Sequence, residues 1–209
     1  MIWRNLRSAL LLALSLPATL LLNSCGSARK DNRNQMIVSV TDQRMLLVHD
    51  GKPVKSYPIS TSKFGIGSEN NSNRTPLGRM EVARKIGEGA PTGMVFKSRR
   101  PTGEVLRPNA PGRDPIVSRI LWLNGTEQHN RNTYGRCVYI HGTPEEWRLG
   151  SPASYGCIRM GMKDVVDLYD RVGEGAEVRV MRGSLLDTWA GQEYASKHSN
   201  GQLLGVAQR

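Results

Sequence analysis

The sequence predicts a single, mainly β domain with one or two short helices late in the chain. The 22 Gly and 11 Pro of the 209 residues are about 16% of the chain against an average of roughly 12%, which favours strands joined by turns over a helix bundle. Short β-rich runs recur, and helical periodicity is clear only after Gly161. With 38% hydrophobic and 22% charged residues, the chain is typical of a folded protein and not of a polytopic membrane protein or a disordered one.

The first residues predict an export signal. Arg4 and Arg7 precede an apolar stretch from Ser8 to Leu22, and no acidic residue accompanies them. A basic start followed by a short apolar stretch is typical of secretory signals. The stretch has 15 residues and includes Pro17, whereas a membrane-spanning helix needs roughly 18 to 20.

The segment Leu22-Asn23-Ser24-Cys25-Gly26 resembles the lipobox of bacterial lipoproteins. It predicts a signal peptide over residues 1–24, lipidation of Cys25 and a polar tether over residues 25–35. A plain signal cleaved near Ala18 or Ser24, which would leave Cys25 as a free thiol, is the alternative. We therefore expect an exported protein anchored by lipid to a bacterial membrane, the outer membrane facing the periplasm.

The net charge is strongly basic. It is +11 for the whole chain, and removal of the two signal arginines would leave +9. Such a charge usually suggests nucleic acid. Because an exported protein meets no genome, we expect no nucleic acid, and instead anionic lipid headgroups or the carboxylates of cell-wall peptides.

The predicted elements follow in chain order. The Asp50-Gly51 pair is typical of a two-residue turn between strands, and residues 61–74 and 87–115 are rich in turn residues. Loops as long as the second are often lids. The apolar residues Val165, Leu168, Tyr169 and Val172 predict a helix that ends at Gly173. Strands are expected over residues 36–40, 45–49, 52–59, 75–83, 116–123, 137–140 and 176–180.

The tail is expected to be a separate unit. The domain is predicted over residues 36–182, and residues 183–209 form a tail with a second helix through Leu185, Leu186 and Trp189 and a frayed end.

Two short segments carry residues suited to catalysis. His141 closes a β-rich run and Cys157 lies at the edge of a turn. A thiol with an ordinary pKa of about 8.5 is only a few per cent thiolate at neutral pH, so a cysteine nucleophile needs a base or positive surroundings. His141 can supply the base and Arg159 the charge, and amides around Gly156 can face the oxygen of a tetrahedral intermediate.

Together with two earlier segments, these residues resemble the L,D-transpeptidase family with the YkuD-type catalytic domain. The family's active-site signature corresponds to His141-Gly142-Thr143 with Ser154-Tyr155-Gly156-Cys157-Ile158-Arg159-Met160. Many members have His where this chain has Tyr155. The other segments are Val38 to Met45 with the Asp50-Gly51 hairpin, and Arg74-Thr75-Pro76-Leu77-Gly78. The resemblance covers most of residues 36–181 and implies a β-sandwich or barrel-like catalytic fold.

The resemblance also implies a reaction. Cys157 would attack the carbonyl between the L-centre of diaminopimelate and the terminal D-alanine of a peptidoglycan tetrapeptide stem, leaving a thioester. His141 would act as general base and acid, oriented by the carbonyl of Gly142. The acceptor would be another stem, a lipoprotein lysine, a free D-amino acid or water. No metal or organic cofactor is required.

The remaining signature residues receive binding roles from the same resemblance. Amides of Tyr155, Gly156 and Cys157 would form the oxyanion hole, and Ser154 would belong to the same oxyanion and substrate site. Arg159 would pair with a stem carboxylate or brace the loop.

Other interpretations of the two body cysteines stay open. In an oxidising compartment Cys137 and Cys157 could form a disulfide, permanent or reversible; otherwise Cys137 is expected to be a small buried residue. A zinc site of Cys137, His141 and Cys157 lacks closely spaced ligand pairs. Surface positions are expected for the other histidines, His49, His129 and His198; the alternative, that its loop reaches the pocket, is open for His129 alone.

Two alternative functions also stay open. One is an L,D-carboxypeptidase or endopeptidase that uses water as acceptor, and the other is a catalytically silent peptidoglycan-binding lipoprotein. The sequence does not separate transfer from hydrolysis, because that choice depends on acceptor access, expected around residues 61–74 and 87–115.

Overall fold

The computed structural model describes residues 30–198. The predicted signal peptide, Cys25 and the chain from residue 199 lie outside the described residues. Within the described range, no helix is both long and apolar enough to cross a membrane.

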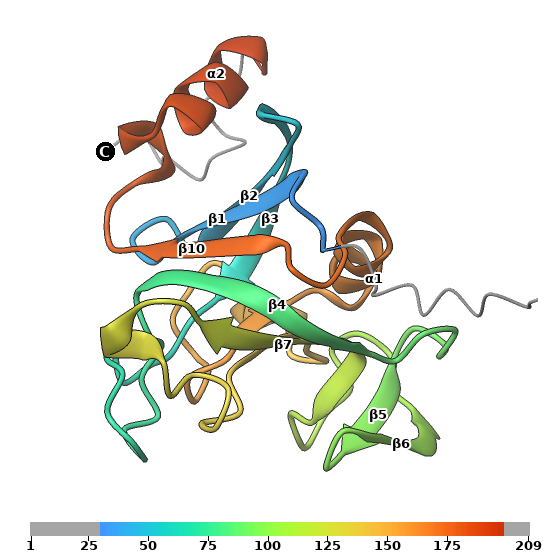
Figure 1. Ribbon diagram of the computed structural model, residues 1–209. Coiled ribbons are helices and arrows are strands. Elements are labelled where there is room, and N and C mark those ends of the chain that lie inside the picture. The colour runs from blue at the N-terminus through green and yellow to red at the C-terminus, as the bar shows by residue number, and fades with distance from the viewer. Residues whose placement is uncertain (1–29, 199–209) are drawn as a thin grey trace, which may run out of the picture.

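Eight strands form a closed, barrel-like ring, which confirms the predicted mainly β fold (Figure 1). The order around the ring is β4-β10-β1-β2-β3-β9-β8-β7, and β7 pairs with β4 to close it. The N-terminal strand β1 pairs in parallel with the late strand β10. The strands of the ring are β1 Asn34–Ser39, β2 Arg44–His49, β3 Lys52–Ser60, β4 Gly78–Ile86, β7 Ile116–Gly125, β8 Tyr139–Gly142, β9 Ile158–Met160 and β10 Glu177–Met181.

The core lies inside the ring and is completed by helix α1 (Met162–Arg171). The predicted helical positions Val165, Leu168 and Tyr169 are buried in this core together with apolar residues from every strand of the ring. The helix places a fixed apolar face against β7 and β8, and β8 carries His141. The ring and helix thus form a rigid support for the signature residues.

A second apolar layer covers the outer face of β1, β2 and β3. Ile37, Leu46 and Val48 point away from the ring and pack under Leu185 and Tyr194. Tyr194 belongs to α2 (Trp189–Lys197), which follows the short 3-10 helix η3 (Leu185–Asp187). The side chain of Thr188 accepts a hydrogen bond from the amide of Gly191 and caps α2.

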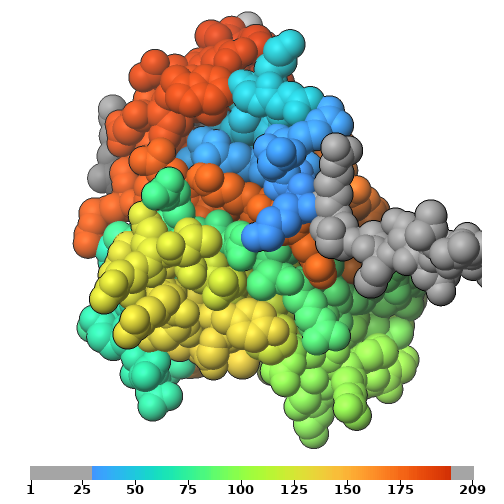
Figure 2. Space-filling view, in the orientation of Figure 1, coloured from blue at the N-terminus to red at the C-terminus, as the bar shows by residue number. Residues whose placement is uncertain are grey.

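The segment 87–115, expected to be a loop without regular structure, contains a β-hairpin of β5 (Met94–Lys97) and β6 (Arg100–Val105). Strand β5 pairs with β7, and β6 is the exposed edge. Ser98 and Arg99 both have positive φ at a turn that usually selects Asn-Gly, so neither residue type indicates a turn here. Figure 2 shows this hairpin (light green) and the α2 region (red) at opposite ends of one face.

The end of the predicted tether is fixed to the domain. Strand β1 starts at Asn34, and the carboxylate of Asp31 accepts hydrogen bonds from the amides of Asn34 (3.1 Å) and Gly173 (2.7 Å). The amide of Asp31 donates to the carbonyl of Glu174 at 2.8 Å. The domain therefore begins a few residues before residue 36.

Candidate active site

Parallel strands β8 and β9 bring His141, Cys157 and Arg159 to one face of the sheet. Ile140 pairs with Ile158 and His141 with Arg159. Since side chains alternate along a strand, Ile140 and Ile158 enter the core, while Cys157 joins the outer apolar cluster. With strands about 4.8 Å apart and about 3.3 Å per residue, the Cα atoms of His141 and Cys157 are about 8 Å apart on the diagonal.

The imidazole of His141 is buried and held in one orientation. Its Nδ1 lies 2.9 Å from the carbonyl oxygen of Gly142; Nδ1–H donates, which leaves Nε2 as the proton acceptor. Burial lowers the pKa of His141 to about 4, and the charge of Arg159 adds to this effect, whereas the Gly142 contact opposes it. His141 is a neutral base at pH 7.

Gly142 has to be glycine for this arrangement. A Cβ there would stand 2.6 Å from the carbonyl oxygen of Val117 on β7 and 3.0 Å from Cγ1 of Val165 on α1. The close approach of β7, β8 and α1 fixes the carbonyl that orients His141.

Cys157 is a neutral thiol at rest. Burial raises its pKa to about 11, although the amide of Tyr139 and the charge of Arg159 lower it. The Sγ–H donates to the carbonyl oxygen of Cys137 at 3.6 Å. The Cys157 side chain would have to rotate away from this carbonyl before its thiol could contact His141.

These two pKa values predict how stability depends on pH. Between pH 6.5 and about 4 the unfolded chain binds the His141 proton more tightly than the folded one, so the free energy of unfolding falls as the pH is lowered. Above pH 9 the unfolded thiol of Cys157 ionises first, so stability also falls as the pH is raised. Urea unfolding from pH 4.5 to 10.5 measures both effects.

Two variants isolate these contributions. His141→Gln is expected to make the free energy of unfolding nearly independent of pH between pH 4.5 and 6.5. Cys157→Ala is expected to weaken the fall of the free energy of unfolding above pH 9. If the free energy of unfolding of His141→Gln falls between pH 6.5 and 4.5 as steeply as that of the wild type, His141 is not a buried neutral imidazole.

The turn before Cys157 is fixed by hydrogen bonds within it and to the segment around Thr75. Ser154 Oγ donates to the carbonyl of Cys157 at 2.6 Å and accepts from the amide of Gly156 at 3.2 Å. The buried Thr75 hydroxyl donates to the carbonyl of Gly156 at 3.1 Å. Gly156 has φ +116°, a backbone conformation that favours glycine.

This turn changes the expected oxyanion hole. The amide of Gly156 already donates to Ser154, so it is not free for a substrate oxygen. Within residues 30–198, the amides of Tyr155 and Cys157 have no acceptor. The Ser154 hydroxyl both donates and accepts a hydrogen bond within this turn.

Arg159 forms ion pairs with two acidic residues next to the site. Its guanidinium is buried, with Nη2 at 2.6 Å from Oδ2 of Asp114 and Nη1 at 3.6 Å from Oε2 of Glu145. Thr143 Oγ1 donates to the other oxygen of Asp114 at 2.5 Å. The guanidinium faces Asp114, and Arg159 does not line the cavity described below.

Replacement of Arg159, the positive partner of this ion pair, should destabilise the fold. Arg159→Met leaves the carboxylate of Asp114, which is only 13% exposed, beside an apolar side chain, which is expected to lower the free energy of unfolding by about 3 kcal/mol. Chemical denaturation measures this change in the free energy of unfolding. The double variant Arg159→Met with Asp114→Asn should lose less than the sum of the single variants, and strict additivity would show that the pair is not coupled.

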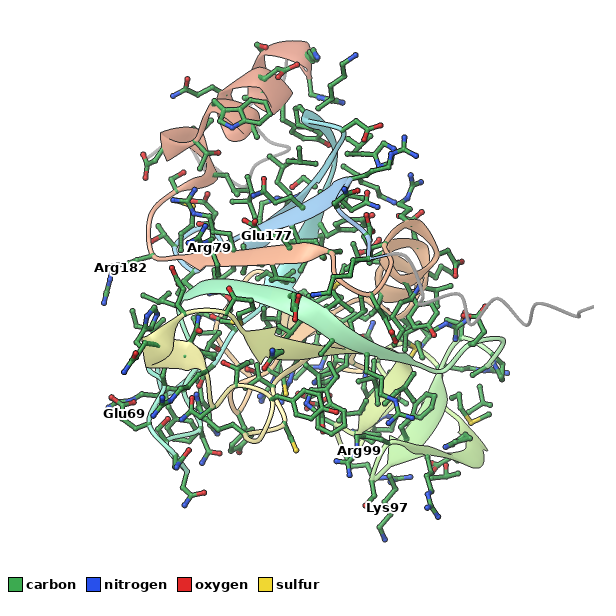
Figure 3. All side chains as sticks on the ribbon, in the orientation of Figure 1. Glu69, Arg79, Lys97, Arg99, Glu177 and Arg182 are labelled. Carbon is green, nitrogen blue, oxygen red and sulfur yellow. The ribbon has the colours of Figure 1, made fainter. Side chains whose placement is uncertain are left out.

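A cavity of about 790 Å³ opens next to Cys157 and is the candidate substrate site. Its walls come from the loops around residues 70–73 and 131–138 and from the turn 155–157. Arg136 joins two of these walls, since its guanidinium donates to the carbonyls of Arg74 (2.8 Å) and Gly67 (3.2 Å). The hairpin of residues 94–105, expected to be a lid, does not line this cavity. Figure 3 shows Lys97 on the hairpin pointing away from the body of the molecule.

Tyr155, His129 and Cys137 take three different positions relative to this cavity. Tyr155 lines the cavity with an exposed ring that lies 5.6 Å from the ring of Phe64, and its hydroxyl accepts from Lys63 Nζ at 2.9 Å. His129 does not reach this cavity; it contacts the carbonyl of Leu77 at 3.1 Å in a separate depression. Cys137 is half-buried with φ +56° and precedes β8, so it is not a buried strand residue.

Sequence reasoning missed Arg131, Arg136 and Asp114. Arg131 is exposed, lines the cavity and forms no ion pair within the described residues. No sequence signal marked them: residues 124–136 are about as rich in Lys and Arg as the whole chain, and the partners of Arg136 and Asp114 are far away in the chain.

The family description "L,D-transpeptidase catalytic domain", YkuD, matches residues 33–180. The chain is 28% identical over 145 residues to a protein of Bacillus subtilis strain 168 named putative L,D-transpeptidase YkuD, covering 69% of this chain and 64% of that protein. A protein of the same name from Bacillus licheniformis is 26% identical over 147 residues, covering 70% of this chain and 64% of that one. The chain thus spans 64% of the length of either relative.

Solved structures are more distant. An L,D-transpeptidase from Mycobacterium smegmatis has 18% identity and a TM-score of 0.47, with 71% of this chain and 58% of that chain covered. L,D-transpeptidase 3 from Mycobacterium tuberculosis in complex with a faropenem-derived adduct has 17% identity and a TM-score of 0.48, with 72% and 60% covered.

Proposed function

Because the chain belongs to the L,D-transpeptidase family with the YkuD-type catalytic domain, we propose that it is a cysteine acyltransferase acting on peptidoglycan stem peptides. The observation that carries the proposal is the placement of Cys157 on a large cavity, with His141 on the same sheet face and its Nε2 available as a base.

The proposed reaction has two acyl transfers. The Cys157 sulfur attacks the carbonyl between diaminopimelate and the terminal D-alanine, while Nε2 of His141 takes the thiol proton. The amides of Tyr155 and Cys157 stabilise the oxyanion. Collapse breaks the amide bond, His141 returns the proton to the leaving D-alanine amine, and a thioester remains. An acceptor amine then attacks the thioester, gives its proton to His141 and regenerates the thiol.

The positive charge of the cavity walls suits a stem peptide that carries a carboxylate. Arg131 and Arg136 line it with the amides of Asn70, Asn71 and Asn132, and no carboxylate does. Since Arg136 is already used between the walls, Arg131 is the guanidinium available to a stem carboxylate.

Arg131→Gln is therefore expected to raise KM about ten-fold, or about 1.4 kcal/mol of binding, for a tetrapeptide with a free diaminopimelate carboxylate, with kcat little changed. For a substrate with that carboxylate amidated, the variant and the wild type should have the same KM. Lys97→Gln, on the exposed hairpin, is the charge-matched control. An equal KM change for both substrates contradicts a carboxylate contact.

Incubation with disaccharide-tetrapeptides followed by mass spectrometry tests the reaction. Dimers that have lost D-alanine support transfer. Tripeptides without dimers assign the hydrolase function instead, and unchanged muropeptides favour a binding role. Added D-amino acids or a lysine-bearing lipoprotein peptide identify the acceptor.

We also propose that the protein is exported and held by lipid on Cys25 at the outer membrane, facing the periplasm. The support is the basic and apolar start of the chain and the segment Leu22 to Gly26. Labelling of cells with an alkyne fatty acid should mark the wild type and not Cys25→Ser, and membrane fractionation should assign the membrane. Equal labelling of both contradicts the anchor.

A further inference from the structure

Cys137 brings a second thiol to the cavity of the proposed nucleophile. Both cysteines are free and both line the cavity, and the Sγ of Cys157 is 3.6 Å from the carbonyl oxygen of Cys137. A carbonyl oxygen lies about 2.4 Å from the Cα of its own residue, which places the Cys157 sulfur within about 6 Å of the Cys137 Cα. A disulfide brings the two Cβ atoms to about 3.5–4.5 Å from each other, so a rearrangement of the turn that carries Cys137 has to accompany the bond.

The local structure keeps the Cys137 side chain at the edge of the cavity. Cys137 is in the left-handed conformation, with φ +56°, and its amide donates to the carbonyl of Tyr134 at 3.0 Å. The sulfur lies 3.9 Å from Nη1 of Arg99 and 3.9 Å from the carbonyl of Gly135. It is half-buried, so a small oxidant reaches it from solvent.

The strand pairing brings the two cysteines to the same part of the sheet. Cys137 precedes β8 by two residues and Cys157 precedes β9 by one. The two strands are adjacent and parallel, and both cysteines belong to the same outer apolar cluster. The two thiols therefore lie close to the starts of neighbouring strands.

We propose that Cys137 and Cys157 form a reversible disulfide that switches the nucleophile off. First, the Cys137 thiolate attacks one sulfur of a small disulfide; a mixed disulfide forms and the other sulfur leaves as a thiol, taking up the proton that Cys137 lost. Then His141 takes the proton of Cys157, whose sulfur attacks the Sγ of Cys137, and the second small thiol leaves with that proton. Two protein thiols are oxidised and one disulfide is reduced to two thiols.

The consequence for activity rests on the proposed function, because only an acylating Cys157 is inactivated in this way. The side chain of Cys137 takes no part in the acyl transfer itself, since only its backbone carbonyl contacts Cys157. A dithiol reverses the bond and restores both thiols.

The test uses the full chain in buffers of oxidised and reduced glutathione. The wild type is expected to lose two hydrogen atoms in intact mass, and trypsin should yield the peptides Cys137–Arg148 and Leu149–Arg159 joined by a bond. Acylation by a carbapenem should fall at least about ten-fold at the oxidising ratio and recover with dithiothreitol.

Two variants give the sharpest comparison. Cys157→Ala should hold one glutathione on Cys137, because nothing resolves the mixed disulfide. Cys137→Ala keeps an L-residue at this backbone position and should retain its acylation rate at every glutathione ratio. If the wild type keeps glutathione without forming the linked peptides, or if Cys137→Ala is inactivated like the wild type, the proposal is overturned.

The mass readout needs no activity. A linked pair in a protein that never acylates supports the disulfide and counts against the proposed function, whereas active wild type with no linked pair counts against the disulfide alone.

Discussion

Cys157→Ala is expected to lose acyl transfer by at least about 10⁴-fold, because no other side chain at this position of the cavity can carry the thioester. The fold should survive. The sulfur packs at the edge of the cluster of Phe96, Ile120 and Trp122, so its loss is expected to cost about 1 kcal/mol.

Intact mass after incubation with a carbapenem measures the effect directly, since the strained lactam carbonyl acylates a cysteine and leaves one adduct. The wild type should carry one adduct on Cys157, and Cys157→Ala none. Cys137→Ala is the matched control, because it removes the neighbouring thiol and should still carry one adduct. An adduct on Cys157→Ala, or one located on Cys137 in the wild type, removes the assigned nucleophile.

His141→Gln is expected to slow acylation about 10³-fold, within the range for loss of a general base. Gln fills much of the same buried volume and its amide can donate to Gly142, so the change removes the proton acceptor and little else. Because Cys157 remains, the adduct should still form slowly. Its rate should climb as the pH rises toward about 11, the pKa to which burial raises the thiol.

His129→Gln is the control for this variant, since His129 lies in a separate depression and its loss should leave the rate unchanged. A rate for His141→Gln that equals the wild type at pH 7, or one that does not rise with pH, shows that His141 is not the base for Cys157.

Local patterns predicted most of the ring. The Asp50-Gly51 pair forms the expected turn with both residues at positive φ, and the spacing of Val165, Leu168 and Tyr169 placed α1 correctly. These features depend on near neighbours in the chain. The β5–β6 hairpin could not be predicted in this way, because its turn is made by Ser98 and Arg99 and its stability comes from pairing with β7.

In the candidate site, too, some residues could be predicted from local sequence and others could not. The positions of His141 and Cys157 follow from a short signature, and the strand pairing brings them together. Asp114 carried no signal, because it lies in an irregular segment 45 residues before its partner Arg159. The use of the Gly156 amide by Ser154 depends on the shape of the turn, which residue types alone do not specify.

The parallel pairing of β1 with β10 also governs when the protein can fold. The side chains of Gln35 and Glu177 meet at 2.7 Å although they are 142 residues apart, and β10 is also the partner of β4. The ring therefore cannot close until nearly the whole domain has been synthesised. Contacts of such long range make folding slow, and a chain that stays unfolded during its synthesis is suited to the export that we propose.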